Sequence, residues 1–146
     1  MSAAFEPRLT EELLERLLAS DDIETYLDEE RIIDHDLTDY LQGLLSAHGL
    51  KRAAVARESG LNPTVVYDIF SGKSRPGRDH AIMLAFGLDC DLRETQRLLR
   101  LAGVSELWCR QRRDAIIIWC IRNGLDRTGT DDELYRLGEL TLLRAD

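Results

Sequence analysis

Apolar residues recur at intervals of three and four along several segments of the chain, the spacing that lines one face of an α-helix. Leucines 13, 14, 17 and 18 follow this pattern after Thr10, a helix-capping residue type. A second helix start, at Asp21 with Glu24 three residues on, has the form of a capping box. Later segments also predict helices, with apolar residues at Leu37, Leu41, Leu44 and Leu45, at Ala81, Ile82, Leu84, Ala85 and Phe86, and at Leu92, Leu98, Leu99 and Leu101.

Two short helices meeting at a sharp angle are predicted within residues 50–72. The first runs from Lys51 to Ser59 and ends at Gly60, because glycine best tolerates the left-handed backbone of a helix exit. The second begins at Asn62, which can accept hydrogen bonds from the free amides that follow, with Pro63 at the first helical position.

Each of these two helices has an apolar face directed inward. Val55 and Ala56 supply it in the first, and Val66 and Ile69 in the second. The outer face of the second helix then carries Thr64, Val65, Tyr67 and Asp68. These four side chains are therefore candidates for contact with another molecule.

The C-terminal part contains a strongly apolar run at residues 115–121, which is short enough for a strand or a buried helix. Asn123 and Gly124 are typical of a helix exit, and Thr130 with Glu133 forms another capping-box pattern. We therefore expect two more helices and an all-α fold. Five large apolar residues are expected in the core or in a dimer interface: Trp108, Ile116, Ile117, Trp119 and Ile121.

Size and composition indicate one compact unit, with appendages, in a chain of 146 residues. The three cysteines have neither the even count of a disulfide framework nor a Cys-x-x-Cys spacing. The sequence shows no signal-type N-terminus and no apolar run of 18 residues. A reducing cytoplasm is the expected location, with no membrane partner.

Charge is distributed unevenly around a net value of −8. Residues 1–46 carry 13 acids and three arginines, a net charge of −10, whereas residues 51–80 carry six bases and three acids, a net charge of +3. Residues 91–113 are also at +3. Positive charge is therefore concentrated in and after the two short helices, where a negatively charged partner would be attracted.

The order Val55, Ala56, Gly60, Val66, Ile69 resembles a lambda-repressor-like (XRE-type) helix-turn-helix of the bacterial and phage kind. The resemblance covers residues 37–103 and includes a basic loop, SGKSRPGRD at 71–79, like the loop that follows the recognition helix in this family. It implies a five-helix DNA-binding domain. An acidic N-terminal helical extension, residues 1–36, would precede it. A C-terminal helical extension, residues 104–146, would pack on it or form a dimer interface.

The resemblance implies a transcriptional regulator that binds double-stranded DNA as a homodimer, with residues 62–70 in the major groove. The base-reading residues would be Asn62, Thr64, Val65, Tyr67 and Asp68. The phosphate-binding residues would be Lys51, Arg52, Lys73, Ser74, Arg75 and Arg78. Because residues 63–70 contain no Arg, Lys or Gln, guanine cannot be read by a bidentate arginine from this helix, and base specificity would be modest or rest on DNA shape.

The sequence also allows a function other than DNA binding. A protein-binding adaptor on the same fold would suit the acidic flanks, with the N-terminal segment as the contact for a protein partner. The acidic run at residues 28–39 fits a solvated linker, or an arm that competes with DNA for the basic surface. The histidines and cysteines show no metal-ligand spacing, and no nucleophile elbow is present, so we expect no enzyme activity, metal or cofactor.

Overall fold

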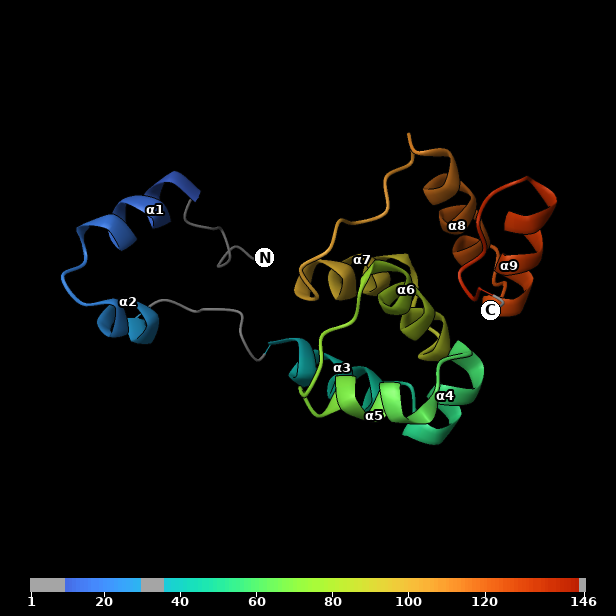
Figure 1. The fold of residues 1–146 in the computed structure, drawn as a ribbon, viewed down its shortest axis with the longest axis horizontal. Helices are drawn as coiled ribbons and strands as arrows, with labels where there is room; N and C mark the ends of the chain where they lie inside the picture. The colour runs from blue at the N-terminus through green and yellow to red at the C-terminus, as the bar shows by residue number, and fades with distance from the viewer. Residues whose placement is uncertain (1–9, 30–35, 145–146) are drawn as a thin grey trace. The chain divides into compact units, whose positions relative to one another are not determined.

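The computed structural model describes residues 10–29 and 36–144 of the chain. These residues belong to two compact units divided after Asp34, and each unit is described by itself. The described residues form nine helices and no strand, which confirms the all-α class (Figure 1). The helices are α1 (Thr10–Ala19), α2 (Ile23–Glu29), α3 (Asp36–Ala47), α4 (Arg52–Ser59), α5 (Pro63–Phe70), α6 (Arg78–Gly87), α7 (Leu92–Leu101), α8 (Arg112–Arg122) and α9 (Arg127–Arg136).

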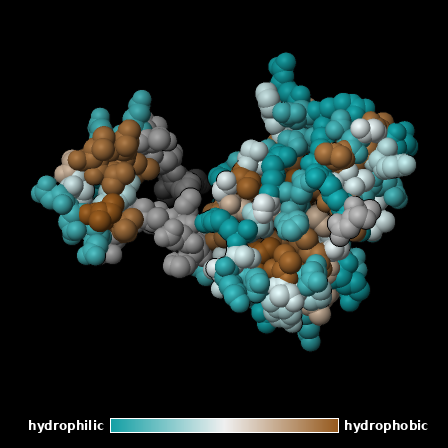
Figure 2. All heavy atoms as spheres, in the orientation of Figure 1, coloured by the Kyte–Doolittle hydropathy of each residue, from teal (hydrophilic) through white to brown (hydrophobic). Residues whose placement is uncertain are grey.

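The first unit contains the pair α1 and α2. The cap of α2 is Asp22 rather than the predicted Asp21, since the Asp22 carboxylate accepts hydrogen bonds from the Glu24 amide and the Thr25 hydroxyl. The side chain of Thr10, expected to cap α1, and residues 30–35, half of the acidic run at 28–39, lie outside what the structure describes. Four large apolar side chains of this unit are exposed, and Figure 2 shows apolar surface gathered on it: Leu14, Leu18, Ile23 and Leu27.

The second unit has one continuous core, to which α3 to α9 and the last described residues all contribute. Its fully buried side chains include Leu41 of α3, Ile69 of α5 and Leu98 of α7. Helices α4 and α6 approach at backbone distance, because a Cβ added at Gly87 would lie 2.7 Å from the carbonyl oxygen of Val55. The core therefore holds α4 and α5 from behind and leaves their outer faces toward solvent.

The turn between α4 and α5 follows the sequence prediction. Gly60 has a left-handed φ of 82°, and Leu61 is buried at the corner. Asn62 accepts a hydrogen bond of 2.8 Å from the Thr64 amide, with Pro63 at the first helical position. The predicted inward residues are buried: Val55, Ala56, Val66 and Ile69.

The C-terminal part forms the two helices expected, but the predicted cap of the second helix is wrong. Helix α9 is capped by Asp126, which accepts a hydrogen bond from the Gly129 amide, while Thr130 is buried inside the helix. Trp108 and Trp119 are 57% and 56% exposed, so they are not core residues, and their place in a dimer interface stays a prediction. An apolar run predicts burial of a helix, but not of every large side chain on it, and here Ile117 alone of the five expected residues is fully buried.

None of the helices in the described ranges has the length and apolar character needed to cross a lipid bilayer.

Candidate nucleic-acid interface

The outer face of α5 carries the side chains expected to read bases. Asn62, Thr64 and Tyr67 are exposed, with Tyr67 at 47%. Val65 and Asp68 are only half-buried, and Val65 packs against the core. The structure thus offers three of the five expected residues freely to solvent and holds the other two partly in the fold.

The start of α4 lies beside this face. The guanidinium of Arg52 stacks over the Tyr67 ring, 4.7 Å from its centroid. This cation–π contact holds a positive charge against the exposed side of α5. Lys51 precedes α4 as its N-cap residue, and no side-chain hydrogen bond caps this positive end of the helix.

The loop between α5 and α6 is anchored at the end of α5. The backbone amides of Lys73 and Ser74 both donate to the carbonyl oxygen of Asp68, at 2.8 and 3.2 Å. The Lys73, Ser74 and Arg75 side chains are exposed. Arg75 also donates from Nη1 to the Leu101 carbonyl oxygen at 3.4 Å, which places this loop against the end of α7.

Arg78 departs from the expectation that it is available to phosphate. Its guanidinium makes two hydrogen bonds to the Asp114 carboxylate, at 3.0 and 2.8 Å, and two more to the carbonyl oxygens of Ser105 and Glu106. The Asp114 carboxylate is 7% exposed and also accepts a hydrogen bond from the Trp108 amide. Arg78 therefore neutralises a buried carboxylate, a pairing that is costly to break from one side.

A second ion pair joins the same two helices, with the arginine on α8 and the aspartate on α6. Arg113 donates from Nη1 and Nη2 to the two carboxylate oxygens of Asp79, at 2.9 and 3.1 Å. The adjacent residues Arg78 and Asp79 begin α6, and Arg113 and Asp114 lie in the first turn of α8. Two ion pairs therefore join the starts of these helices. These pairings were not predicted from the sequence, in which their only signal is the matched Arg-Asp dipeptides at 78–79 and 113–114.

The remaining predicted cations have no such partner. Lys51, Arg52, Lys73 and Arg75 form no ion pair with any carboxylate in the described part of the chain, whereas Arg57 lies 3.5 Å from Glu58. Four cations from two segments therefore flank the outer face of α5 without neutralisation, in a protein whose net charge is −8.

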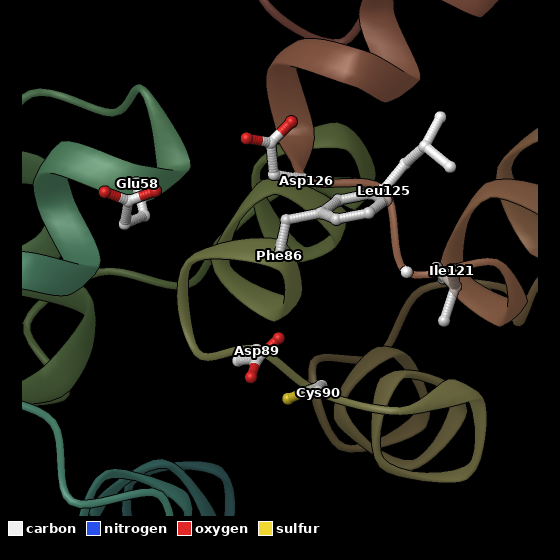
Figure 3. Close-up of a pocket in the computed structure, with 8 residues that line it drawn as sticks. Glu58, Phe86, Asp89, Cys90, Ile121, Leu125 and Asp126 are labelled. Atoms are coloured by element: carbon white, nitrogen blue, oxygen red, sulfur yellow. The ribbon is translucent and has the colours of Figure 1, made fainter.

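A cavity of about 210 Å³ lies on another part of the unit (Figure 3). Glu58, Asp89 and Asp126 contribute three carboxylates to its lining, and Phe86, Cys90, Ile121, Gly124 and Leu125 complete it. The carboxylates make its field negative, so this cavity is unsuited to phosphate and is separate from the surface described above.

Among residues 10–29 and 36–144, no group of three or more His, Cys, Asp or Glu side chains is arranged to hold a metal ion. Comparison of the chain with models of protein families, with curated proteins and with solved structures gave no match.

Proposed function

We propose that residues 37–103 form a helix-turn-helix domain of the lambda-repressor-like type, and that the protein is a transcriptional regulator that binds duplex DNA. In this proposal α5 enters the major groove, with Asn62, Thr64 and Tyr67 at the base edges. Lys51, Arg52, Lys73 and Arg75 contact phosphates, and the exposed Ser74 hydroxyl can donate to one.

The observation that carries this proposal is the exposed face of α5 between two segments whose cations are unpaired. Binding to duplex DNA is driven largely by neutralisation of phosphates, and local cations matter more than net charge when they are brought to one surface. The core supports the geometry, since Val66 and Ile69 are buried and fix which side of α5 faces out. We expect a homodimer, because a single short helix reads few base pairs.

The decisive experiment begins with selection of genomic DNA fragments on the purified protein, followed by affinity measurement on a recovered duplex by fluorescence anisotropy. The logarithm of the binding constant should fall against the logarithm of salt concentration with a slope of roughly −4 for each bound protomer, which makes four phosphate contacts. The double substitution Lys73→Glu with Arg75→Glu should weaken binding by more than about tenfold and flatten this slope by about 2.

The matched control is Arg122→Glu, a charge reversal at an exposed residue in the last turn of α8 that forms no ion pair with any described residue. It should retain most of the affinity. A loss of binding free energy in the control that is half the loss in the double variant, in proportion to the charge changed, would mean that only net charge matters, and the proposed surface would be wrong.

A second candidate, a protein-binding adaptor, is favoured by one observation. Leu14, Leu18, Ile23 and Leu27 are exposed in the first unit, among acidic residues such as Glu15 and Asp22. Exposed apolar side chains in this number are typical of a protein contact. Failure to retain any duplex at low salt in the same selection would favour the adaptor and exclude DNA binding.

A further inference from the structure

We propose that the loop between α7 and α8 is a second contact with the DNA backbone, made by Trp108 and Arg110. This inference rests on the proposed function and assigns DNA binding to the C-terminal extension, where the sequence analysis expected only packing or a dimer interface.

The loop between α7 and α8 begins beside a proposed phosphate contact. Arg75, a proposed phosphate contact, donates to the carbonyl oxygen of Leu101 at the end of α7. Three residues later, Arg78 donates to the carbonyl oxygens of Ser105 and Glu106. Residues 75–78 therefore lie beside residues 101–106, although the two segments are about 30 residues apart in sequence.

A shared carboxylate extends this contact to Trp108. Oδ2 of Asp114 accepts a hydrogen bond from Arg78 Nη2 at 2.8 Å and another from the Trp108 amide at 2.9 Å. One oxygen atom thus joins the start of α6 to the backbone of Trp108. Around it lies an open concavity of about 430 Å³, whose lining includes Arg78, Glu106, Trp108 and Gln111.

The ion pairs around this loop leave one of its charged side chains unpaired among the described residues. Arg78 is neutralised by Asp114, so the surface loses the cation that the sequence placed at the start of α6. Arg110 is exposed and pairs with no carboxylate in the described ranges, whereas the nearby Arg112 pairs with Glu139. Glu106, the acidic residue of this loop, is paired with Arg100 at 2.8 Å. Arg110 is therefore the free cation of the loop.

The same loop carries an exposed tryptophan, Trp108. The Trp108 side chain is 57% exposed, and its indole N–H has no hydrogen-bond acceptor among the described residues. An indole in this situation has an apolar face and a free donor. A nucleic-acid backbone offers partners for both, since deoxyribose can pack on the ring and a phosphate oxygen can accept from the N–H.

The test uses the native chain, because Cys109 lies between these two residues and is exposed. Cys90 is half-buried and Cys120 is buried, and burial raises the pKa of both thiols, so they react slowly with a thiol reagent. Alkylation of Cys109 by N-ethylmaleimide, followed by mass spectrometry, should slow by at least about fivefold under a saturating duplex. Protection should disappear at a salt concentration that releases the DNA.

Two matched pairs of variants supply an independent measurement. Arg110→Ala should weaken binding and flatten the salt slope by about 1, and should do so equally for the selected duplex and an unrelated duplex of the same length. Arg122→Ala should leave both the affinity and the salt slope unchanged. Trp108→Ala should weaken binding severalfold, while Trp119→Ala, which removes an equally exposed tryptophan from α8, should leave it unchanged.

The outcomes separate this inference from the proposed function. If a duplex binds but Cys109 reacts at its free rate, or if Arg110→Ala matches Arg122→Ala, the second contact is refuted and DNA binding through α5 stands. If no duplex binds at all, the proposed function and this inference fall together.

Discussion

Similar sequence patterns predict the helix pairs α1–α2 and α4–α5. The two pairs differ in how much of their apolar surface the fold buries. Each pair consists of two short helices with an apolar stripe and a capped start. In α4–α5 the stripe is buried, with Val55 and Val66 at 0% exposure. In α1–α2 the stripe remains open, and Leu18 is 74% exposed.

The difference arises from what each pair packs against. Helix α4 lies against α6 at backbone distance, and α5 packs on a core that also includes α3. Among the described residues of their unit, α1 and α2 have only each other to pack against, and two short helices cannot enclose the side chains between them. An apolar stripe therefore predicts that a helix has an inner face, while burial depends on a partner elsewhere in the chain.

The largest effect that tests this comparison is the loss of one apolar side chain from each pair. Ile69→Ala in α5 should lower the free energy of unfolding by about 2 to 5 kcal/mol, because a fully buried side chain is removed. Leu18→Ala in α1 should change it by less than about 0.5 kcal/mol. Urea unfolding followed by tryptophan fluorescence is suited to this test, because Trp108 and Trp119 both lie in the second unit.

Similar shifts for the two variants would contradict the comparison, because they would mean that the first unit buries Leu18 in solution and unfolds together with the second. Far-ultraviolet circular dichroism of both folded variants provides the control for loss of helix.

A smaller effect is expected from the close approach of α4 and α6. Gly87→Ala should destabilise the second unit by about 1 to 3 kcal/mol, since the added Cβ would lie 2.7 Å from the Val55 carbonyl oxygen and 2.9 Å from the Ser59 Cβ. Gly43→Ala is the matched control, because Gly43 lies within α3 with no atom within 4 Å of its added Cβ. The control should gain up to about 1 kcal/mol from improved helix propensity.

Melting temperatures measured by differential scanning calorimetry should therefore move in opposite directions for the two glycine variants. A neutral Gly87→Ala would show that α4 can shift away from α6, and the rigid support behind the outer face of α5 would then be lost.

Local signals were sufficient to predict the helices and the turn at Gly60, Leu61 and Asn62. A glycine exit, a capping asparagine and a first-turn proline act through neighbouring backbone groups, so the sequence carries them directly. The same reasoning misplaced the cap of α9, because Thr130 with Glu133 and Asp126 with Gly129 are both acceptable starts. Burial of Thr130 against the core decided between them.

The candidate site was less predictable, because its charges are partitioned by contacts between distant segments. Arg75 and Arg78 lie three residues apart in one basic loop. In the structure Arg78 is held by Asp114, 36 residues away, while Arg75 keeps its charge unpaired within the described residues. Apart from the matched Arg-Asp dipeptides at 78–79 and 113–114, no sequence pattern distinguishes the two.

The smallest effect compares the caps of the two helix pairs. Asn62→Ala removes the acceptor of the Thr64 amide and should cost about 1 kcal/mol in the fluorescence-detected unfolding of the second unit. Asp22→Ala removes the acceptor of the Glu24 amide and the Thr25 hydroxyl, and should leave that transition unchanged. Its effect should be confined to faster hydrogen exchange of the amides in α2.

The Asn62 and Asp22 variants are informative together because fluorescence-detected unfolding reports on the second unit, whereas hydrogen exchange in α2 reports on the first. A cap stabilises whatever unfolds together with its helix, so Asn62 acts on the whole second unit and Asp22 on a helix with little tertiary support. If Asp22→Ala lowered the stability of the second unit as much as Asn62→Ala, the two units would unfold as one. The exposed leucines of α1 and α2 would then belong to a shared core rather than to a free apolar face.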